Sequence, residues 1–190
     1  NEVADRVYLI REFVDGPTVD QMIRHGGPLS IARACEFARQ ASLGLAHAHE
    51  KNLAHGSMNP ANLLVAPGMG NGKPVVKVTN FGLGRLAGLS AGDPSQSAPK
   101  CDPADFMAPE QYSRPGTSTP AADVYSLGCT LFYLLAGRPP FPGGTAADKA
   151  KRHMYTTPPP VEHFRPDVPP AVAGLVKAAL AKDPEERWLT

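Results

Sequence analysis

Apolar residues recur every three or four positions along two stretches of the chain, and this spacing predicts two amphipathic helices. The first begins after Ser30, a suitable N-cap, and its apolar face contains Ala34, Phe37, Ala38, Ala41, Leu45 and Ala48. The second covers 170–182, and its inward positions are Val172, Leu175, Val176 and Leu180. The many alanines of the first helix predict close packing at the centre of the domain.

Three further helices are predicted from other patterns. The stretch Ala122–Ala136 is apolar all round, as in a buried helix, and Gly137 followed by prolines ends it. A short helix is capped by Thr18 or Asp20 and runs to about His25 before two glycines. The segment 145–155 is also expected to be helical.

Short strands are predicted where β-branched and aromatic residues run together. Val7–Val14 is one such run, and 63–65 and 75–78 are two more, joined by the Gly- and Pro-rich turn 67–74. From Gly82 to Pro103 the chain has no periodicity and is expected to be a long functional loop.

Composition and charge narrow the class of protein. The chain has 190 residues, 42% of them hydrophobic, and a formal net charge of +1. Near-neutral charge argues against a nucleic acid partner, and no apolar run is long enough to predict membrane contact. Three dispersed cysteines without a C-x-x-C pair argue against structural zinc and suit a cytoplasmic protein.

Five motifs carry the chemistry. They are the polar loop His55-Gly56-Ser57-Met58-Asn59-Pro60-Ala61-Asn62, the triplet Asn80-Phe81-Gly82, Met107-Ala108-Pro109-Glu110, the pair Asp123–Gly128 and Gly137–Phe141, and Lys182-Asp183-Pro184-Glu185-Glu186-Arg187. In this order and spacing the set resembles protein kinases of the bacterial Ser/Thr type.

The resemblance implies an α+β, protein-kinase-like fold. Residues 1–14 correspond to the last strand of the N-lobe and the hinge, and 15–190 to a mostly helical C-lobe with short β-hairpins. Within it, 55–62 is the catalytic-loop region and 80–110 the activation segment. Because the chain begins with Asn1 rather than Met, we expect a piece of a longer protein that is incomplete at both ends, with the N-lobe absent.

The catalytic positions implied by the resemblance are altered. Ser57 stands where kinases carry the aspartate that accepts the substrate proton, and a neutral hydroxyl is a poor base. Gly56 replaces the arginine before it, and Asn59 replaces the lysine that contacts the transferred phosphate. Asp102 is a candidate replacement base.

The metal positions are altered as well. Asn80 replaces the metal-binding aspartate, whereas Asn62, the second ligand of the family, is retained. Magnesium prefers charged carboxylates, so we expect its affinity for this site to be weak or lost.

The architectural positions are kept. The resemblance makes Asp123 the buried carboxylate that holds the catalytic loop, and Glu110 and Arg187 an ion pair behind the activation segment. His55 and Phe81 correspond to two members of the hydrophobic spine.

A nucleotide site is also implied by the resemblance. The hinge offers backbone groups of Glu12 and Val14, and Leu64 with Val19 would supply apolar surface for adenine. We expect ATP to bind weakly, and without metal.

Three functions follow. The first is a pseudokinase that acts as a scaffold or allosteric signalling module through protein partners. The alternative is an active Ser/Thr protein kinase, catalysing ATP-dependent phosphoryl transfer when joined to its N-lobe. A third is a small-molecule phosphotransferase of the aminoglycoside type, whose loop also begins His-Gly.

Overall fold

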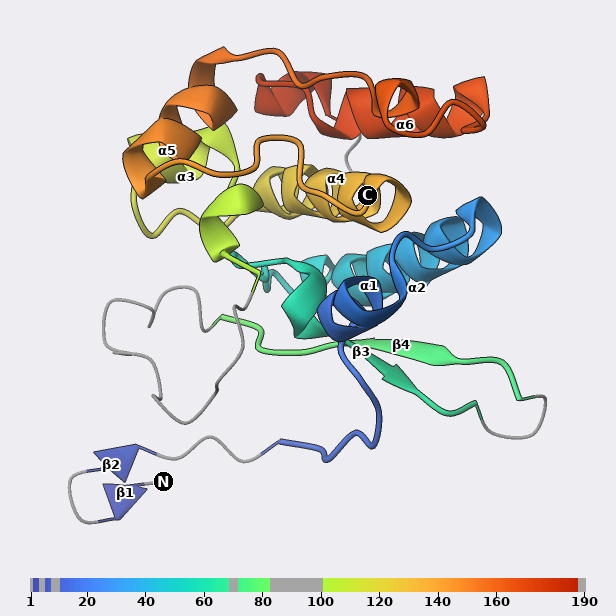
Figure 1. Cartoon of the computed structure of the whole chain (residues 1–190). Coiled ribbons are helices and arrows are strands. Elements are labelled where there is room, and N and C mark those ends of the chain that lie inside the picture. The colour runs from blue at the N-terminus through green and yellow to red at the C-terminus, as the bar shows by residue number, and fades with distance from the viewer. Residues whose placement is uncertain (1, 4–5, 8–10, 69–71, 83–100, 188–190) are drawn as a thin grey trace.

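The computed structural model describes residues 2–3, 6–7, 11–68, 72–82 and 101–187. Helices dominate this part of the chain (Figure 1). They are α1 (Val19–Gly26), α2 (Ile31–His49), α3 (Pro109–Ser113), α4 (Pro120–Ala136), α5 (Ala146–Tyr155) and α6 (Pro170–Ala179). Single 3₁₀ turns lie at η1 (Pro60–Asn62), η3 (Pro103–Asp105), η4 (Val161–His163) and η5 (Pro184–Glu186).

The strands form two small antiparallel sheets. β1 (Glu2–Val3) pairs with β2 (Arg6–Val7) near the N-terminus, and β3 (Leu63–Ala66) pairs with β4 (Val75–Val78). In the second sheet Leu63 lies opposite Val78 and Ala66 opposite Val75. The sequence predicts this hairpin, whose first strand directly follows the polar loop and therefore fixes the end of that loop.

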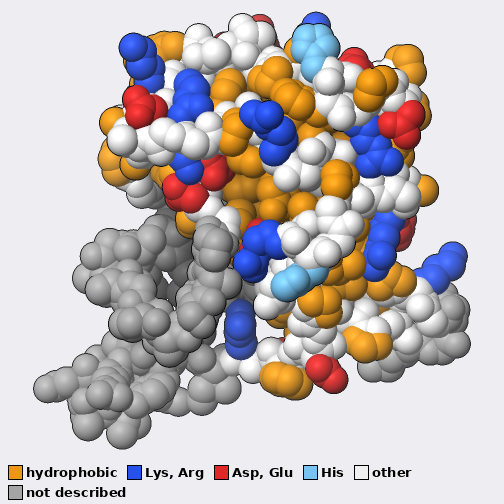
Figure 2. Space-filling model, in the orientation of Figure 1, with side chains coloured by type: hydrophobic (Ala, Val, Ile, Leu, Met, Phe, Trp, Pro, Cys, Tyr) orange, Lys and Arg blue, Asp and Glu red, His pale blue; other side chains and the backbone are white. Residues whose placement is uncertain are grey.

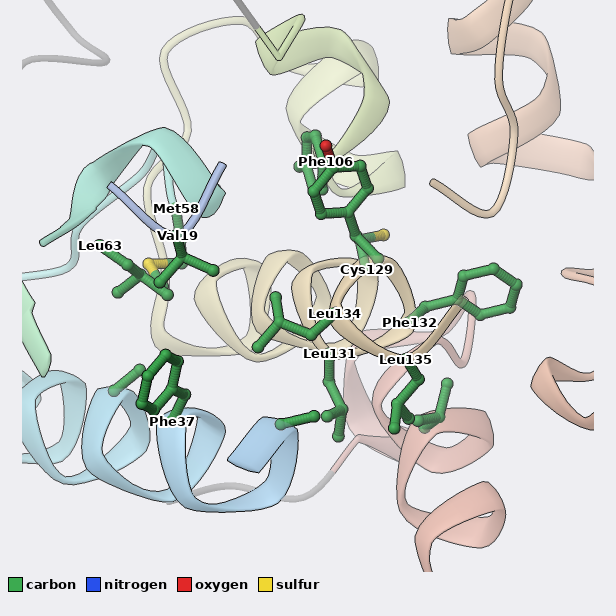
Figure 3. Close-up of a cluster of buried hydrophobic side chains, with 14 of the residues drawn as sticks. Val19, Phe37, Met58, Leu63, Phe106, Cys129, Leu131, Phe132, Leu134 and Leu135 are labelled. Atoms are coloured by element: carbon green, nitrogen blue, oxygen red, sulfur yellow. The ribbon is translucent and has the colours of Figure 1, made fainter. Parts of the chain in front are cut away.

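Helix α4 is the centre of the core. It lies between α2 and α6 in Figure 1, and most of its residues are buried, as its all-round apolar sequence predicts. The cluster around it includes Phe37 of α2, Phe106, and Leu131, Phe132, Leu134 and Leu135 of α4 itself (Figure 3). The central helix therefore gives the polar residues at its N-terminal end a rigid support.

Small residues allow the helices to approach closely. A Cβ placed on Gly128 would lie 2.7 Å from the Cβ of Ala179, so α4 and α6 meet there without room for a methyl group. Close packing of this kind leaves little freedom for either helix to shift.

The predicted helix caps are present. Thr18 caps α1 in a reciprocal capping box with Gln21, and Gly27 ends that helix with a φ of 74°. Ser30 caps α2 as predicted. Thr145, the first residue of the segment predicted to be helical, is the N-cap of α5. Gly137 follows α4 in the left-handed conformation. These boundaries confirm the sequence analysis to within a few residues.

The strand predicted over Val7–Val14 is confirmed at Val7 of β2, which pairs with Glu2 of β1, and is wrong at 11–14, which has no strand structure. Residues 8–10 lie outside the described part of the chain. A strand needs a partner for its backbone groups, and here the chain first reaches β3 further on. Val65 N–H donates to the Pro17 carbonyl over 2.9 Å, and Thr18 bridges Leu64.

Helix α6 also differs from its prediction. It ends at Ala179, before Leu180 and the following Pro-containing turn, and Leu175 is 45% exposed rather than inward. Ala173 and Val176 form the buried contact, and Leu175 is turned about 100° away from its neighbour Val176 on the helix. Most of the loop predicted over 82–103 lies outside the described residues.

No helix in the described chain is both long enough and apolar enough to cross a membrane. Figure 2 shows apolar side chains exposed on the helical face, with Lys and Arg side chains distributed among them.

Candidate active site

A buried carboxylate holds the polar loop in place. Asp123, 1% exposed in the first turn of α4, accepts hydrogen bonds from the backbone N–H groups of His55 and Gly56 over 2.7 and 2.8 Å. The His49 side chain lies 2.8 Å from the same carboxylate. Buried charge is tolerated when donors surround it, so Asp123 fixes the start of the loop as predicted.

His55 links the loop to the segment after β4. Its Nδ1 accepts a hydrogen bond from Ser57 N–H over 3.2 Å, so its Nε2 carries the proton and donates to the Thr79 carbonyl over 2.8 Å. Burial lowers the pKa of this imidazole, which fits the neutral form. The ring centroid lies 4.8 Å from that of Phe81, so the two predicted spine residues are in contact.

Gly56 adopts a conformation that excludes a side chain. Its φ is 75°, and a Cβ there would collide with the Ser118 hydroxyl. Its carbonyl accepts a hydrogen bond from the Gln111 amide over 2.9 Å. Gly56 stands where the resemblance places an arginine. It therefore contributes only backbone contacts to the loop and brings no positive charge.

Ser57 is held through its backbone rather than its hydroxyl. Its carbonyl accepts hydrogen bonds from the side-chain amides of Asn59 and Asn62, over 3.0 and 2.8 Å. Among the described residues its hydroxyl has no hydrogen-bond partner that could draw off its proton. The side chain is neutral and unassisted, so it does not replace a carboxylate base.

The side-chain amide of Asn59 is used within the loop itself. Its side chain is buried, with 4% exposed, and its Oδ1 caps η1 by accepting from Ala61 N–H over 2.9 Å. Because its Nδ2 also donates to Ser57, both ends of the amide serve the loop itself. The residue at the lysine position has a structural role here.

Asn62 and Asn80 are hydrogen-bonded to each other. The Asn80 Nδ2 donates to Asn62 Oδ1 over 2.7 Å, and Asn80 Oδ1 in turn accepts from the Arg11 guanidinium over 2.7 Å. Asn80 has a φ of 67°, a left-handed conformation that asparagine tolerates better than most residues.

These residues do not fit a magnesium ion. Both amide oxygens already accept from N–H donors, and one of those donors is a cation. Magnesium prefers carboxylate oxygens, and the described residues contain no group of three or more His, Cys, Asp or Glu that could hold a metal.

The predicted nucleotide-binding residues are unequally accessible. Val19 is completely buried in the core, whereas Leu64 is half-buried on β3. Glu12 is exposed and accepts a hydrogen bond from Lys77, and Val14 is half-buried. Leu64 therefore offers apolar surface that Val19 does not.

Three ion pairs anchor the segment 102–110 to α5 and to the last described turn. Glu110 and Arg187 pair through both oxygens, over 2.7 and 3.0 Å, as predicted. Lys149 of α5 lies 2.7 Å from a carboxylate oxygen of Asp102 and 2.7 Å from one of Asp105. Because Asp102 is engaged by Lys149 and caps η3, its contacts give no support to a role as base.

Sequence reasoning missed Arg11, Gln111 and Lys149. Arg11 could have been noticed because it forms, with Glu12, a pair of charges inside an otherwise apolar run. Nothing in the local sequence of Gln111 or Lys149 indicates their contacts, which join segments far apart in the chain.

Known proteins resemble this chain along nearly its whole length. The Protein kinase domain model matches residues 1–190. The chain is 33% identical to serine/threonine-protein kinase PknB of Mycolicibacterium smegmatis and 34% identical to PrkC of Bacillus subtilis, covering 96% and 100% of this chain. It spans only 28% of the length of each relative.

Solved structures give the same fold. The kinase domain of Rad53, in a complex with SCD2 and AMPPNP, superposes with a TM-score of 0.71 at 23% identity, covering 94% of this chain and 63% of that one. The PknI kinase domain of Mycobacterium tuberculosis gives a TM-score of 0.65 at 26% identity, covering 93% and 58%. The chain therefore belongs to the protein kinase family and has the fold of its Ser/Thr kinases.

Proposed function

We propose that this chain belongs to a pseudokinase, a kinase-shaped module that acts through protein partners rather than by phosphoryl transfer. The observation that carries the proposal is the closed pair Asn62–Asn80, joined over 2.7 Å. Where the kinases it resembles bring a carboxylate and an amide to a metal, this chain joins two neutral amides. Positioning and neutralising the phosphates is most of what a kinase does for catalysis.

The proton acceptor supports the same proposal. Ser57 stands at the position of the catalytic aspartate, and its contacts are made by its backbone. Asn59, at the lysine position, is buried against the loop. The three positions that should handle the substrate proton, the phosphate and the metal are all neutral.

The retained framework supports a binding role. Asp123 still fixes the loop, and Glu110 and Arg187 still tie the activation segment to the last turn. A module of this kind presents a rigid surface for binding but does not catalyse a reaction. We therefore propose that it binds protein partners in the cytoplasm.

An active Ser/Thr kinase is the second candidate, because relatives such as PknB and PrkC are named as kinases and the His55–Phe81 contact is intact. The aminoglycoside-type reading has less support, since the matching family model is that of protein kinases.

The test is phosphoryl transfer from labelled ATP by the full-length protein, to itself and to a generic protein substrate. We expect no incorporation above background. Incorporation that is lost in Ser57→Ala but kept in Ser113→Ala, an exposed control serine, would overturn the proposal and establish the second candidate.

A further inference from the structure

The guanidinium of Arg11 lies at the metal positions of this site. Its Nη1 donates to Asn80 Oδ1 over 2.7 Å, although the two residues are 69 positions apart. Asn80 then donates to Asn62, and Asn62 donates to the Ser57 carbonyl over 2.8 Å. The result is one relay in which a cation stands at one end and each amide oxygen accepts from the group before it.

A metal ion could bind here only if the two asparagine amides turned away from their present hydrogen-bond donors. A divalent cation needs the oxygens of Asn62 and Asn80 turned toward it, but N–H groups occupy them. Arg11 would also repel it, since like charges at close range are unfavourable. The positive charge of the site is therefore carried by a side chain.

That charge has no carboxylate partner in the described part of the chain. The neighbouring acid, Glu12, accepts from Lys77 instead, and Ser57, Asn59, Asn62 and Asn80 are neutral. A guanidinium has five N–H donors, and one of them is used on Asn80. The remaining donors suit an anion with several oxygens, above all a phosphate.

We infer that Arg11 takes the place of the metal ion, so that the site binds the phosphates of a nucleotide without magnesium. Leu64, half-buried on the adjacent strand β3, supplies apolar surface for the base. The inference rests on the proposed non-catalytic function, because it concerns binding at a site that no longer supports phosphoryl transfer. Its test measures binding alone and is independent of the transfer assay.

The first experiment is calorimetric titration of the full-length protein with ATP, once with EDTA and once with excess magnesium. We expect ATP to bind at least as tightly with EDTA, because free ATP carries more negative charge than its magnesium complex. Arg11→Met should weaken binding in EDTA by about tenfold or more, as for loss of a charged hydrogen bond. Arg114→Met, which removes another exposed arginine, should leave it unchanged.

A second variant tests the relay itself. Asn80→Asp gives Arg11 a carboxylate partner, so ATP binding in EDTA should weaken while the protein remains folded. The double variant Arg11→Met/Asn80→Asp removes the cation and restores an acid, and its ATP binding should depend on magnesium.

Separate titrations with adenosine and with tripolyphosphate measure how much each part of ATP contributes to binding. Both should bind more weakly than ATP. Tripolyphosphate binding as tightly as ATP would overturn the nucleotide as ligand. Wild-type binding that requires magnesium, the absence of any ATP binding at millimolar concentration, or an Arg11→Met variant with unchanged affinity would each overturn the role of Arg11.

Discussion

The polar loop 55–62 and the framework behind it, formed by Asp123, Glu110 and Arg187, differ in how they use charge. In the framework, Asp123 accepts two backbone hydrogen bonds, and Arg187 is bound by both oxygens of Glu110. In the loop, Ser57, Asn59 and Asn62 bond through neutral amides and carbonyls. Charged side chains thus anchor the backbone behind the loop, whereas neutral groups make the contacts within it.

The largest effect on the difference between these two regions is expected from removing Arg187, the buried cation of the framework. Arg187 is 3% exposed, and besides Glu110 it donates to the carbonyls of Ala181, Ala121 and Lys182. Arg187→Met should lower the free energy of unfolding by about 3–5 kcal/mol, because it leaves a partly buried carboxylate unpaired. Urea denaturation of the full-length protein measures this. Arg114→Met is the matched control and should change stability by less than about 0.5 kcal/mol.

Asp123→Ala attacks the other framework charge. It leaves the N–H groups of His55 and Gly56 without their acceptor. At about 1–3 kcal/mol for each of the two buried groups left unsatisfied, the expected loss is about 2–6 kcal/mol. Asp167→Ala, at an exposed ion pair, is the control. Equal stabilities for the two variants would contradict the anchoring role.

The loop should also resist a larger residue at Gly56. Gly56→Ala is expected to cost about 1–3 kcal/mol, because φ is positive there and Ser118 fills the space of a side chain. Gly26→Ala in α1 meets no atom within 4 Å and should be near neutral. Thermal unfolding of the pair separates conformational strain from the general effect of an added methyl group.

Low pH should decrease the free energy of unfolding through His153 of α5. Burial lowers the pKa of this imidazole to about 3, and its Nδ1 lies 2.9 Å from the Tyr125 hydroxyl. The unfolded chain takes up the proton near pH 6.5 and the folded chain only near pH 3. Stability should therefore fall, as the pH drops through that window, by about 1.4 kcal/mol per unit.

Comparing two histidines tests this pH dependence in both regions. His153→Gln in the framework and His55→Gln in the loop should each flatten the pH profile of the unfolding free energy, because burial lowers the pKa of both imidazoles. His163→Gln, at an exposed histidine, should leave the profile unchanged. A profile unaffected by the first two substitutions would contradict the assignment of buried neutral imidazoles.

Local signals predicted most of the fold. The caps Thr18 and Ser30 and the terminator Gly137 act over a few residues, and the structure has each where the sequence indicates. The predicted strand failed at 11–14 because strand formation depends on a partner that sequence pattern does not supply.

The candidate site was predictable only through its motifs. They place Asp123 at the loop and Glu110 against Arg187, and both contacts are present. A sequence does not indicate which groups an asparagine side chain will contact. The Asn62–Asn80 hydrogen bond and the capping role of Asn59 are therefore seen only in the structure. Arg11 reaches Asn80 across 69 positions, beyond any local pattern.

The left-handed Gly56 also bears on which substitutions this loop can accept. A side chain introduced at this position would have to adopt a positive φ and displace the Ser118 side chain at the same time. Shortening Ser118 would relieve the steric contact but not the backbone strain. Residues 56 and 118 are therefore coupled, and a tolerant pair of substitutions would have to satisfy both requirements together.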